Sequence, residues 1–325
     1  MRFIIYGVGA IGGTMAAALT LAGHEVVGIA RGKMLEAIKA DGLLFRSPEG
    51  ENRVHFPCHG GPDEINFRPD DVVILTMKGQ DTHEALLALR AAGVTTQAVL
   101  CAQNGVANER EALRLFPNVY GVTVMMPADY VVPGEVNCYG GPKLGIFDIG
   151  CFPRGLDKRA EAIAEVLRSA NFGAFLLEDV MQSKHGKLLS NLGNVLEAAL
   201  GPGSDRKDFM DRAIAEAKAV YRTAGIDWME VGPNSKDPRR EGMMELRDIP
   251  GITRVGGSST QSVQRGAPSI ETDYLNGEIV LLGRLHGVPT PVNAGLVALG
   301  QRLIKEKLEP GAVSRAELEA LLAPG

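Results

Sequence analysis

The sequence predicts a two-domain protein, in which an open α/β sheet domain is followed by an all-helical domain. A short apolar strand runs into a glycine-rich turn near the start of the chain, and apolar strands then alternate with helical segments to about residue 178. Beyond that residue the periodic segments are helical. A length of 325 residues is typical of two domains, which we expect at residues 1–178 and 179–325.

The composition is that of a globular protein, with 45% apolar and 22% charged residues. The net charge of -5 and the sequence pI near 5.8 argue against nucleic acid or an anionic membrane as the main partner. We therefore expect small-molecule partners, and the sequence leaves a homodimer open.

The cysteines are scattered singly, without the paired spacing of zinc sites, so we expect core or free thiols and no metal: Cys58, Cys101, Cys138 and Cys151. Such thiols suit the reducing cytosol. The N-terminal apolar run lacks a basic leader with a cleavage site, and no uncharged apolar run reaches about 18 residues. We therefore expect a cytoplasmic protein.

A glycine-rich turn follows the first predicted strand. The strand at residues 2–6 leads into Gly7-Val8-Gly9-Ala10-Ile11-Gly12, and a helix at 14–22 and a strand at 24–30 complete the unit. Glycines at this spacing permit a tight turn, close approach of a pyrophosphate and close packing of helix on strand. The phosphates would lie at the helix N-terminus. This context predicts a Rossmann-type domain that binds a dinucleotide.

The end of the second strand indicates which dinucleotide binds. An NAD site would place a carboxylate there for the ribose 2′-hydroxyl, whereas this chain has Arg31 and Lys33. Two cations favour a 2′-phosphate and therefore NADPH. The alternative is that both residues simply open the next helix, where cations are unfavourable near the positive end of the helix dipole.

Two polar residues follow the ends of later predicted strands. Lys78 comes after the strand at 71–76, and Asn104 after the strand at 98–102. Because ligands of open α/β sheets bind at the carboxyl edge, both are candidates to contact the cofactor or the substrate. Lys78 as a solvated loop cation, and Asn104-Gly105 as a plain turn, remain the alternatives. Residues 131–150 predict a turn and two antiparallel strands, and 156–170 a helix.

A polar stripe marks the segment at residues 183–199, which we expect to form one helix. Lys187, Asn191, Asn194 and Ala198 fall on one narrow face, and leucine and valine cover much of the rest. An ammonium and two carboxamides lose free energy on burial unless something hydrogen-bonds them. The stripe therefore faces a partner, a water-filled cleft or a ligand, or else it is simply the solvent face of the helix.

Further helices are expected at residues 207–224, 258–264 and 270–286, and another begins at Thr290-Pro291. Ser314 and Glu317 predict a capping box for the last one. The connection at residues 227–257 is charged and interrupted by Pro and Gly.

The specific motifs of the chain can be taken together: Gly7-x-Gly9-x-x-Gly12, Arg31, Lys78, Asn104-Gly105, Pro133-Gly134, Lys187-x-x-x-Asn191, and S-S-T-Q-S-V-Q-R-G-A-P-S-I-E-T-D-Y-L-N-G before His286-Gly287-Val288-Pro289. In these motifs the chain resembles the ketopantoate reductase family over nearly its whole length. The resemblance implies a C-terminal domain like that of 6-phosphogluconate dehydrogenase. It also implies NADPH-dependent reduction of 2-dehydropantoate to (R)-pantoate in pantothenate biosynthesis.

The resemblance also implies residue roles. Lys187 would place its ammonium at the substrate carbonyl, and Glu271 would be the second catalytic group. Asn104 would lie beside nicotinamide and substrate, and Asn191 and Ser259 would bind substrate. An ammonium beside a developing alkoxide supplies both a positive charge and a proton, a role worth about 10²–10⁴ in rate.

Two departures from the family pattern concern the substrate. The family commonly has a second asparagine four residues after the first, whereas here position 195 is Val and the asparagine is Asn194. The connection at residues 227–257 also looks longer than a minimal member needs. A reductase of a different 2-oxo acid is therefore one alternative. A catalytically silent NADPH-binding regulator is an alternative of a different class.

Overall fold

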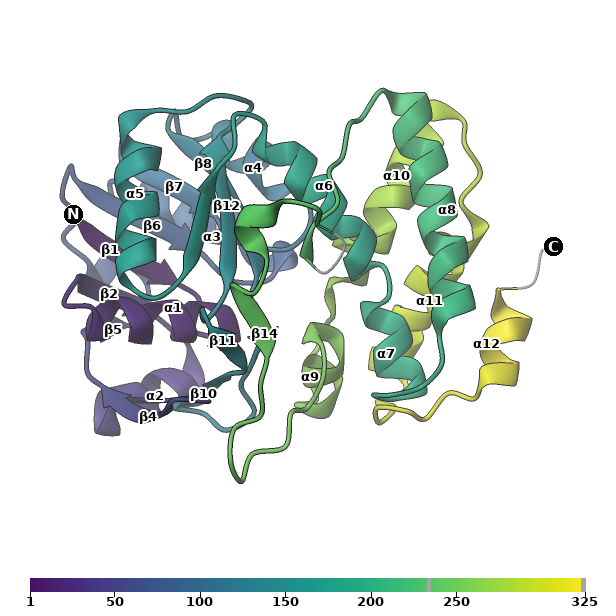
Figure 1. Ribbon diagram of the computed structural model, residues 1–325, viewed down its shortest axis with the longest axis horizontal. Helices are drawn as coiled ribbons and strands as arrows, with labels where there is room; N and C mark the ends of the chain where they lie inside the picture. Colours follow the sequence, from purple (N-terminus) through teal and green to yellow (C-terminus); the bar gives the residue numbers. More distant parts are fainter. Residues whose placement is uncertain (233–234, 323–325) are drawn as a thin grey trace. The chain divides into compact units, whose positions relative to one another are not determined.

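A computed structural model describes residues 1–232 and 235–322 of the chain. It has two compact units, Met1–Lys184 with Glu230–Thr253, and His185–Met229 with Arg254–Gly325. The first unit is built on a β-sheet with helices and the second is helical, which confirms the predicted fold class (Figure 1). None of the described helices is long and apolar enough to cross a membrane.

An eight-stranded sheet forms the first unit, in the order β13-β12-β8-β7-β6-β1-β2-β5. The six strands from β8 to β5 in this order are parallel, and β12 runs antiparallel to β8. The bounds are β1 Arg2–Tyr6, β2 Glu25–Ile29, β5 Cys58–His59, β6 Asp71–Leu75, β7 Ala98–Cys101, β8 Val119–Met125, β12 Ile146–Cys151 and β13 Gly173–Leu176.

Side chains alternate between the two faces of this sheet. On β1, Phe3 and Ile5 join one hydrophobic core and Ile4 joins the other. Because both faces are covered, the strands read as continuous apolar runs rather than alternating ones. The covering helices are α1 Ala10–Leu21, α2 Gly32–Asp41, α3 Thr82–Ala91, α4 Asn108–Leu113 and α5 Lys158–Ser169, with 3-10 turns η1 Pro62–Glu64 and η2 Gly79–Asp81.

The prediction of two antiparallel strands within residues 131–150 is wrong. The segment forms three strands that lie in three different sheets. Strand β10 Glu135–Cys138 belongs to a four-stranded sheet with β3 Leu43–Ser47, β4 Gly50–Val54 and β9 Ala128–Asp129. Strand β11 Gly140–Pro142 belongs to a two-stranded sheet, and β12 belongs to the main sheet. The chain turns back sharply after β11, where any side chain at Gly140 would clash with the Leu144 carbonyl. Each of the three strands pairs with a strand outside the segment: β10 with β3 and β9, β11 with Met244–Leu246, and β12 with β8 and β13.

The segment Glu230–Thr253, which the sequence division at residue 178 assigns to the second domain, packs with the first unit. Its strand β14 Met244–Leu246 pairs antiparallel with β11, after the 3-10 turn η4 Pro238–Arg240. The Arg240 guanidinium makes a bidentate pair with the buried carboxylate of Asp148, with Nη2–Oδ1 2.6 Å and Nη1–Oδ2 3.2 Å. A buried carboxylate needs such a partner, so this ion pair anchors the segment to the sheet.

The second unit is formed by helices. Their bounds are α7 Asn194–Leu200, α8 Lys207–Ala224, α9 Ser258–Gln264, α10 Asn276–His286, α11 Pro291–Lys305 and α12 Arg315–Leu321, with the 3-10 turn η5 Glu271–Tyr274. The predicted helices at 207–224 and 258–264 are confirmed, as is the capping box of Ser314 and Glu317. Helix α6 Val180–Asn191 begins in the first unit and ends in the second.

Two predicted long helices are interrupted. The helix expected at 183–199 breaks after Asn191, and α7 starts at Asn194. The break leaves the Leu192 carbonyl without an intrahelical donor, and the buried Asn276 Nδ2 donates to it at 3.1 Å. The helix expected at 270–286 is a 3-10 turn followed by α10, because Leu275 leaves the helical region at φ -109° and ψ -85°.

Candidate active site

The glycine turn lies at the carboxyl end of β1, where the chain order of the sheet reverses between β1 and β6. Gly7 has φ +106°, a conformation that favours glycine, and its carbonyl accepts a hydrogen bond from Thr76 Oγ1 at 2.8 Å. Helix α1 starts at Ala10 with Gly9 as its N-cap, which has no side-chain cap and no acidic residue in the first turn. The amides at this helix start are thus suited to an anion.

Gly9 and Gly12 differ in the space around them. A side chain at Gly12 would clash with the Gly7 carbonyl and with Thr76 Oγ1, so this glycine permits close packing of α1 on the strands. At Gly9 the nearest atom to an added Cβ is Tyr130 Cε1 at 3.6 Å, which is ordinary contact. Gly9 is therefore not required by packing, and its missing side chain leaves room for a phosphate. These features fit a dinucleotide in the predicted turn of Gly7, Val8, Gly9, Ala10, Ile11 and Gly12.

Arg31 follows β2 and is the N-cap of α2, with its side chain 74% exposed. Its Nη2 lies 3.4 Å from Asp81 Oδ1, in the turn after Lys78. Sequence reasoning missed Asp81, because no local pattern indicates that the loops after β2 and β6 meet. The exposed guanidinium, with the exposed Lys33 two residues on, is accessible to an anionic group.

Lys78 and Asn104 lie where the sequence predicted them, after the carboxyl ends of β6 and β7, and both are half-buried. Lys78 caps the turn η2, and its carbonyl accepts from the Asp81 amide at 2.9 Å. The Asn104 carbonyl accepts from Asn108 Nδ2 at 3.1 Å, which fixes the backbone of its loop. Since β6 and β7 are parallel neighbours, the two loops share one edge of the sheet with the glycine turn.

In the second unit, Lys187 and Asn191 lie on successive turns of α6. Burial lowers the pKa of the Lys187 ammonium, and among the described residues of its own unit no carboxylate lies within ion-pairing distance of Nζ. Asn191 is 4% exposed, and its Nδ2 has no hydrogen-bond partner in the described part of the chain. An unpaired buried amide costs about 1–3 kcal/mol. Both groups thus favour a ligand that accepts hydrogen bonds.

Asn194 does not extend this stripe as predicted. Because the helix breaks, Asn194 is the first residue of α7 and is half-buried, so it does not share the continuous helix face on which the sequence placed it with Lys187 and Asn191. Val195 is 1% exposed and lies in the apolar core of its unit. The departure from the family pattern is therefore located at the start of a separate helix.

Ser259 and Glu271 are both buried, in α9 and at the start of η5. The Ser258 hydroxyl approaches the Glu271 carboxylate, with Oγ–Oε2 3.5 Å. Glu197 holds the start of α9 by accepting from the Gly257 amide and from Thr260 Oγ1, while Arg206 Nη2 pairs with it at 2.8 Å. Sequence reasoning missed Ser258 and Glu197, since neither lies in a pattern that differs from an ordinary helix end.

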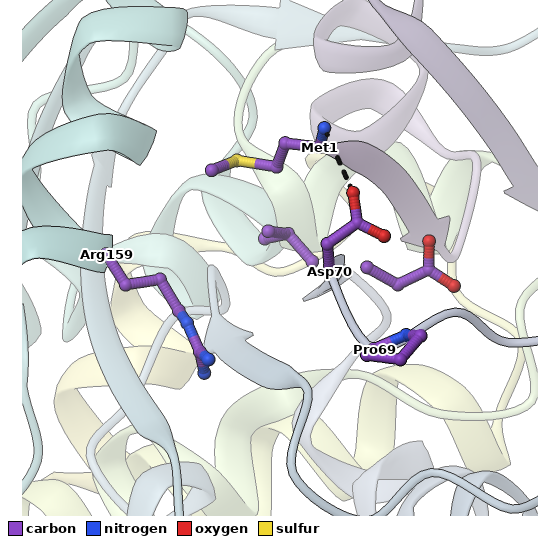
Figure 2. A pocket seen from close by; sticks show the side chains of 6 residues that line it. Met1, Pro69, Asp70 and Arg159 are labelled. Atoms are coloured by element: carbon purple, nitrogen blue, oxygen red, sulfur yellow. Dashed lines mark ion pairs between the residues drawn. The ribbon is translucent and has the colours of Figure 1, made fainter.

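A surface cavity of about 240 Å³ lies at the opposite edge of the sheet, at the starts of β1 and β6. Figure 2 shows the Met1 ammonium pointing to Asp70, with Pro69 and Arg159 alongside. This edge carries none of the residues at the glycine turn. The cavity is therefore separate from the candidate site.

Characterised proteins resemble this chain over most of its length. The 2-dehydropantoate 2-reductase of Aquifex aeolicus is 28% identical over 90% of this chain and 94% of its own. The structure of a PanE/ApbA family ketopantoate reductase from Ralstonia eutropha JMP134 has a TM-score of 0.76 at 26% identity, covering 94% of this chain and 99% of that one. A D-mandelate dehydrogenase solved with NADH and anilino(oxo)acetate shares the fold, with a TM-score of 0.76 at 22% identity over 94% and 99% of the two chains.

The fold and these relatives define the chain as an oxidoreductase that acts on a CH–OH group. Residues 3–154 match the family described as Ketopantoate reductase PanE/ApbA, and residues 179–303 match the C-terminal domain of the same family. The chain belongs to the ketopantoate reductase family. The resemblance seen in the sequence is thereby confirmed.

The two glycines give a first prediction. Gly9→Ala should leave the free energy of unfolding nearly unchanged but weaken dinucleotide binding at least about tenfold, because the new methyl group displaces a phosphate rather than protein atoms. Gly12→Ala should instead destabilise the fold, since its methyl group meets backbone and Thr76. Urea unfolding and dinucleotide titration of both variants measure this. Unchanged binding in Gly9→Ala would contradict the assignment of the turn.

Proposed function

We propose that this chain is a cytoplasmic, NADPH-dependent reductase of a 2-oxo acid, with 2-dehydropantoate as substrate and (R)-pantoate as product. The observation that carries the proposal is the pair on α6: the desolvated ammonium of Lys187 and the unpaired amide of Asn191 one turn later. A 2-oxo acid offers a ketone oxygen and a carboxylate as acceptors for such groups. The relatives named 2-dehydropantoate 2-reductase support the choice of acid.

The cofactor assignment depends on the residues of this chain. The fold alone does not decide it, because D-mandelate dehydrogenase with the same fold was solved with NADH. Here Arg31 and Lys33 follow β2, and no carboxylate stands between them. Asp81 lies beside Arg31, but a single exposed ion pair is worth about 1 kcal/mol or less, so a 2′-phosphate can displace it. This geometry supports the proposal that Arg31 binds the 2′-phosphate and that the glycine turn binds the pyrophosphate.

The chemistry assigns roles to few side chains. When bound, the nicotinamide supplies a hydride to the ketone carbon, and the ketone oxygen gains negative charge. Lys187 would hold a proton at Nζ for that oxygen and stabilise its charge. Asn191 would orient the substrate through Nδ2, and Ser259, Asn194 and Glu271 would contact its polar groups. Asn104 would lie beside the nicotinamide and the ketone.

The choice of substrate depends on the side chains at the start of α7, where this chain departs from the family pattern. The family's usual asparagine position is occupied by Val195, which is core, so Asn194 is the remaining carboxamide there. A site that hydrogen-bonds a substrate hydroxyl rejects analogues without it, because its own polar group is left unpaired. A different 2-oxo acid is therefore the second candidate. A silent NADPH-binding regulator is the third. The buried Nδ2 of Asn191 argues against it, because a buried donor that no acceptor satisfies costs stability unless a substrate accepts from it.

The cofactor proposal predicts unequal losses in affinity. Arg31→Ala should raise the Kd for NADPH at least about tenfold, as expected for a lost charge-assisted hydrogen bond, and change the Kd for NADH less than about threefold. Lys39→Ala removes an exposed cation from the far end of the same helix and should affect neither. Fluorescence titration of the parent and both variants with both dinucleotides measures the six Kd values. Equal losses for NADPH and NADH in Arg31→Ala would remove the 2′-phosphate assignment.

The role of Lys187 predicts a loss of activity without a loss of stability. Lys187→Met should lower kcat at least about 10²-fold with a nearly unchanged Kd for NADPH, since the proton donor is lost. The variant should be at least as stable as the parent at neutral pH, because burial lowers the pKa of Lys187 in the folded state and a charged group is removed. This gain should shrink as pH rises through the folded pKa, where the parent's lysine loses its proton too.

In the parent, the rate of 2-oxo acid reduction should fall as pH rises through the pKa of Lys187, below the ordinary value for lysine. Urea unfolding at several pH values and pH–rate profiles measure both effects. A near-normal kcat in Lys187→Met would rule out Lys187 as the proton donor.

A further inference from the structure

A second lysine on α6 is buried more deeply than Lys187. Lys184 is 3% exposed, and its Nζ donates to the carbonyls of Cys101 at 3.2 Å and Gln103 at 3.0 Å and to the carboxylate of Glu109. These three acceptors use all three protons of the ammonium. Glu109 is fully buried in the first turn of α4, and burial raises the pKa of its carboxyl group. All four residues belong to the first unit.

Stability alone does not account for this pair. Desolvating two charges costs several kcal/mol, and well-packed apolar residues in the place of a buried ion pair are often neutral or stabilising. A buried ion pair can instead select one arrangement of the groups around it. Here those groups are the last carbonyl of β7 and the carbonyl directly before Asn104.

Other buried polar groups fix the same loop. Gln103 Nε2 donates to Thr82 Oγ1 at 2.7 Å, Thr82 Oγ1 donates to Asn108 Oδ1 at 2.8 Å, and Asn108 Nδ2 donates to the Asn104 carbonyl at 3.1 Å. The residue after Asn104 is Gly105 with φ +82°, so the loop reverses at this point. The backbone on both sides of the Asn104 side chain is thus held by buried hydrogen bonds.

We propose that Lys184 and Glu109 are positioning residues for Asn104: the buried ammonium holds the carbonyls of Cys101 and Gln103, and thereby sets the direction of the Asn104 side chain toward the reacting groups. This rests on the proposed role of Asn104 in 2-oxo acid reduction. Lys184 lies one turn before Lys187 on α6, and its hydrogen bond to the Cys101 carbonyl connects α6 to the end of β7. Shifts of about 1 Å at a reacting centre can cost about 10²-fold in rate.

The test removes both charges together, since either single variant would leave an uncompensated buried charge and could fail to fold. Lys184→Met/Glu109→Leu should remain folded and keep its Kd for NADPH within about threefold, while kcat/KM for the 2-oxo acid falls at least about tenfold, mainly in kcat. The matched control is Arg2→Met/Asp71→Asn, which removes a buried ion pair at the opposite edge of the same sheet. The control should leave the kinetic constants unchanged.

The same double change in an Asn104→Ala background tests whether the effect acts through Asn104. If it does, the ion-pair change adds no further loss to that of Asn104→Ala. Wild-type kinetics in Lys184→Met/Glu109→Leu, or a full further loss in the Asn104→Ala background, would overturn the proposal.

A readout independent of turnover separates this proposal from the proposed function. Amide hydrogen exchange of residues 103–106 should become at least about tenfold faster in Lys184→Met/Glu109→Leu than in the parent, and stay unchanged in the control. Unchanged exchange would overturn the positioning role even in an active enzyme. Faster exchange in a chain that reduces no 2-oxo acid would support the positioning role and refute the proposed function.

Discussion

The burial of two ammonium groups on one helix is the constraint on which the proposed site depends. Lys184 is paired, and its three protons are used by two carbonyls and a carboxylate. Lys187 lies one turn further along α6, where burial lowers its pKa and no carboxylate among the described residues of its own unit pairs with it. A low dielectric strengthens the attraction within an ion pair, and it makes an unpaired charge costly. The paired lysine is therefore suited to hold structure, and the unpaired one to give up a proton.

In the glycine turn of the first unit, one glycine is required by packing and another is suited to a ligand. Gly12 is required because α1 approaches Gly7 and Thr76 closely, whereas Gly9 has space beside it that the protein does not fill. A pattern of three glycines thus contains one position for packing and one for a ligand. Buried ion pairs lie at both edges of the same sheet: Arg2 pairs with Asp71 at the starts of β1 and β6, and Lys184 pairs with Glu109 near the end of β7.

Much of the first unit could be predicted from the sequence, because parallel strands buried on both faces are continuous apolar runs bounded by turns. The positions of Arg31, Lys78 and Asn104 at one sheet edge followed from chain order alone. The breaks after Asn191 and at Leu275 could not be predicted, because each depends on tertiary partners such as Asn276, far away in sequence. Lys184 with Glu109, and Arg31 with Asp81, were missed for the same reason: each pair joins segments whose proximity exists only in the folded chain.

The central claim is that this chain reduces a 2-oxo acid with NADPH and that the acid is 2-dehydropantoate. The most direct measurement is NADPH oxidation with a panel of 2-oxo acids that includes 2-dehydropantoate and its analogue without the 4-hydroxyl group. The account predicts the highest kcat/KM for 2-dehydropantoate, since a site that hydrogen-bonds the hydroxyl rejects the analogue that lacks it. A preference for the deoxy analogue would contradict the substrate, and no oxidation with any 2-oxo acid would contradict the reductase itself.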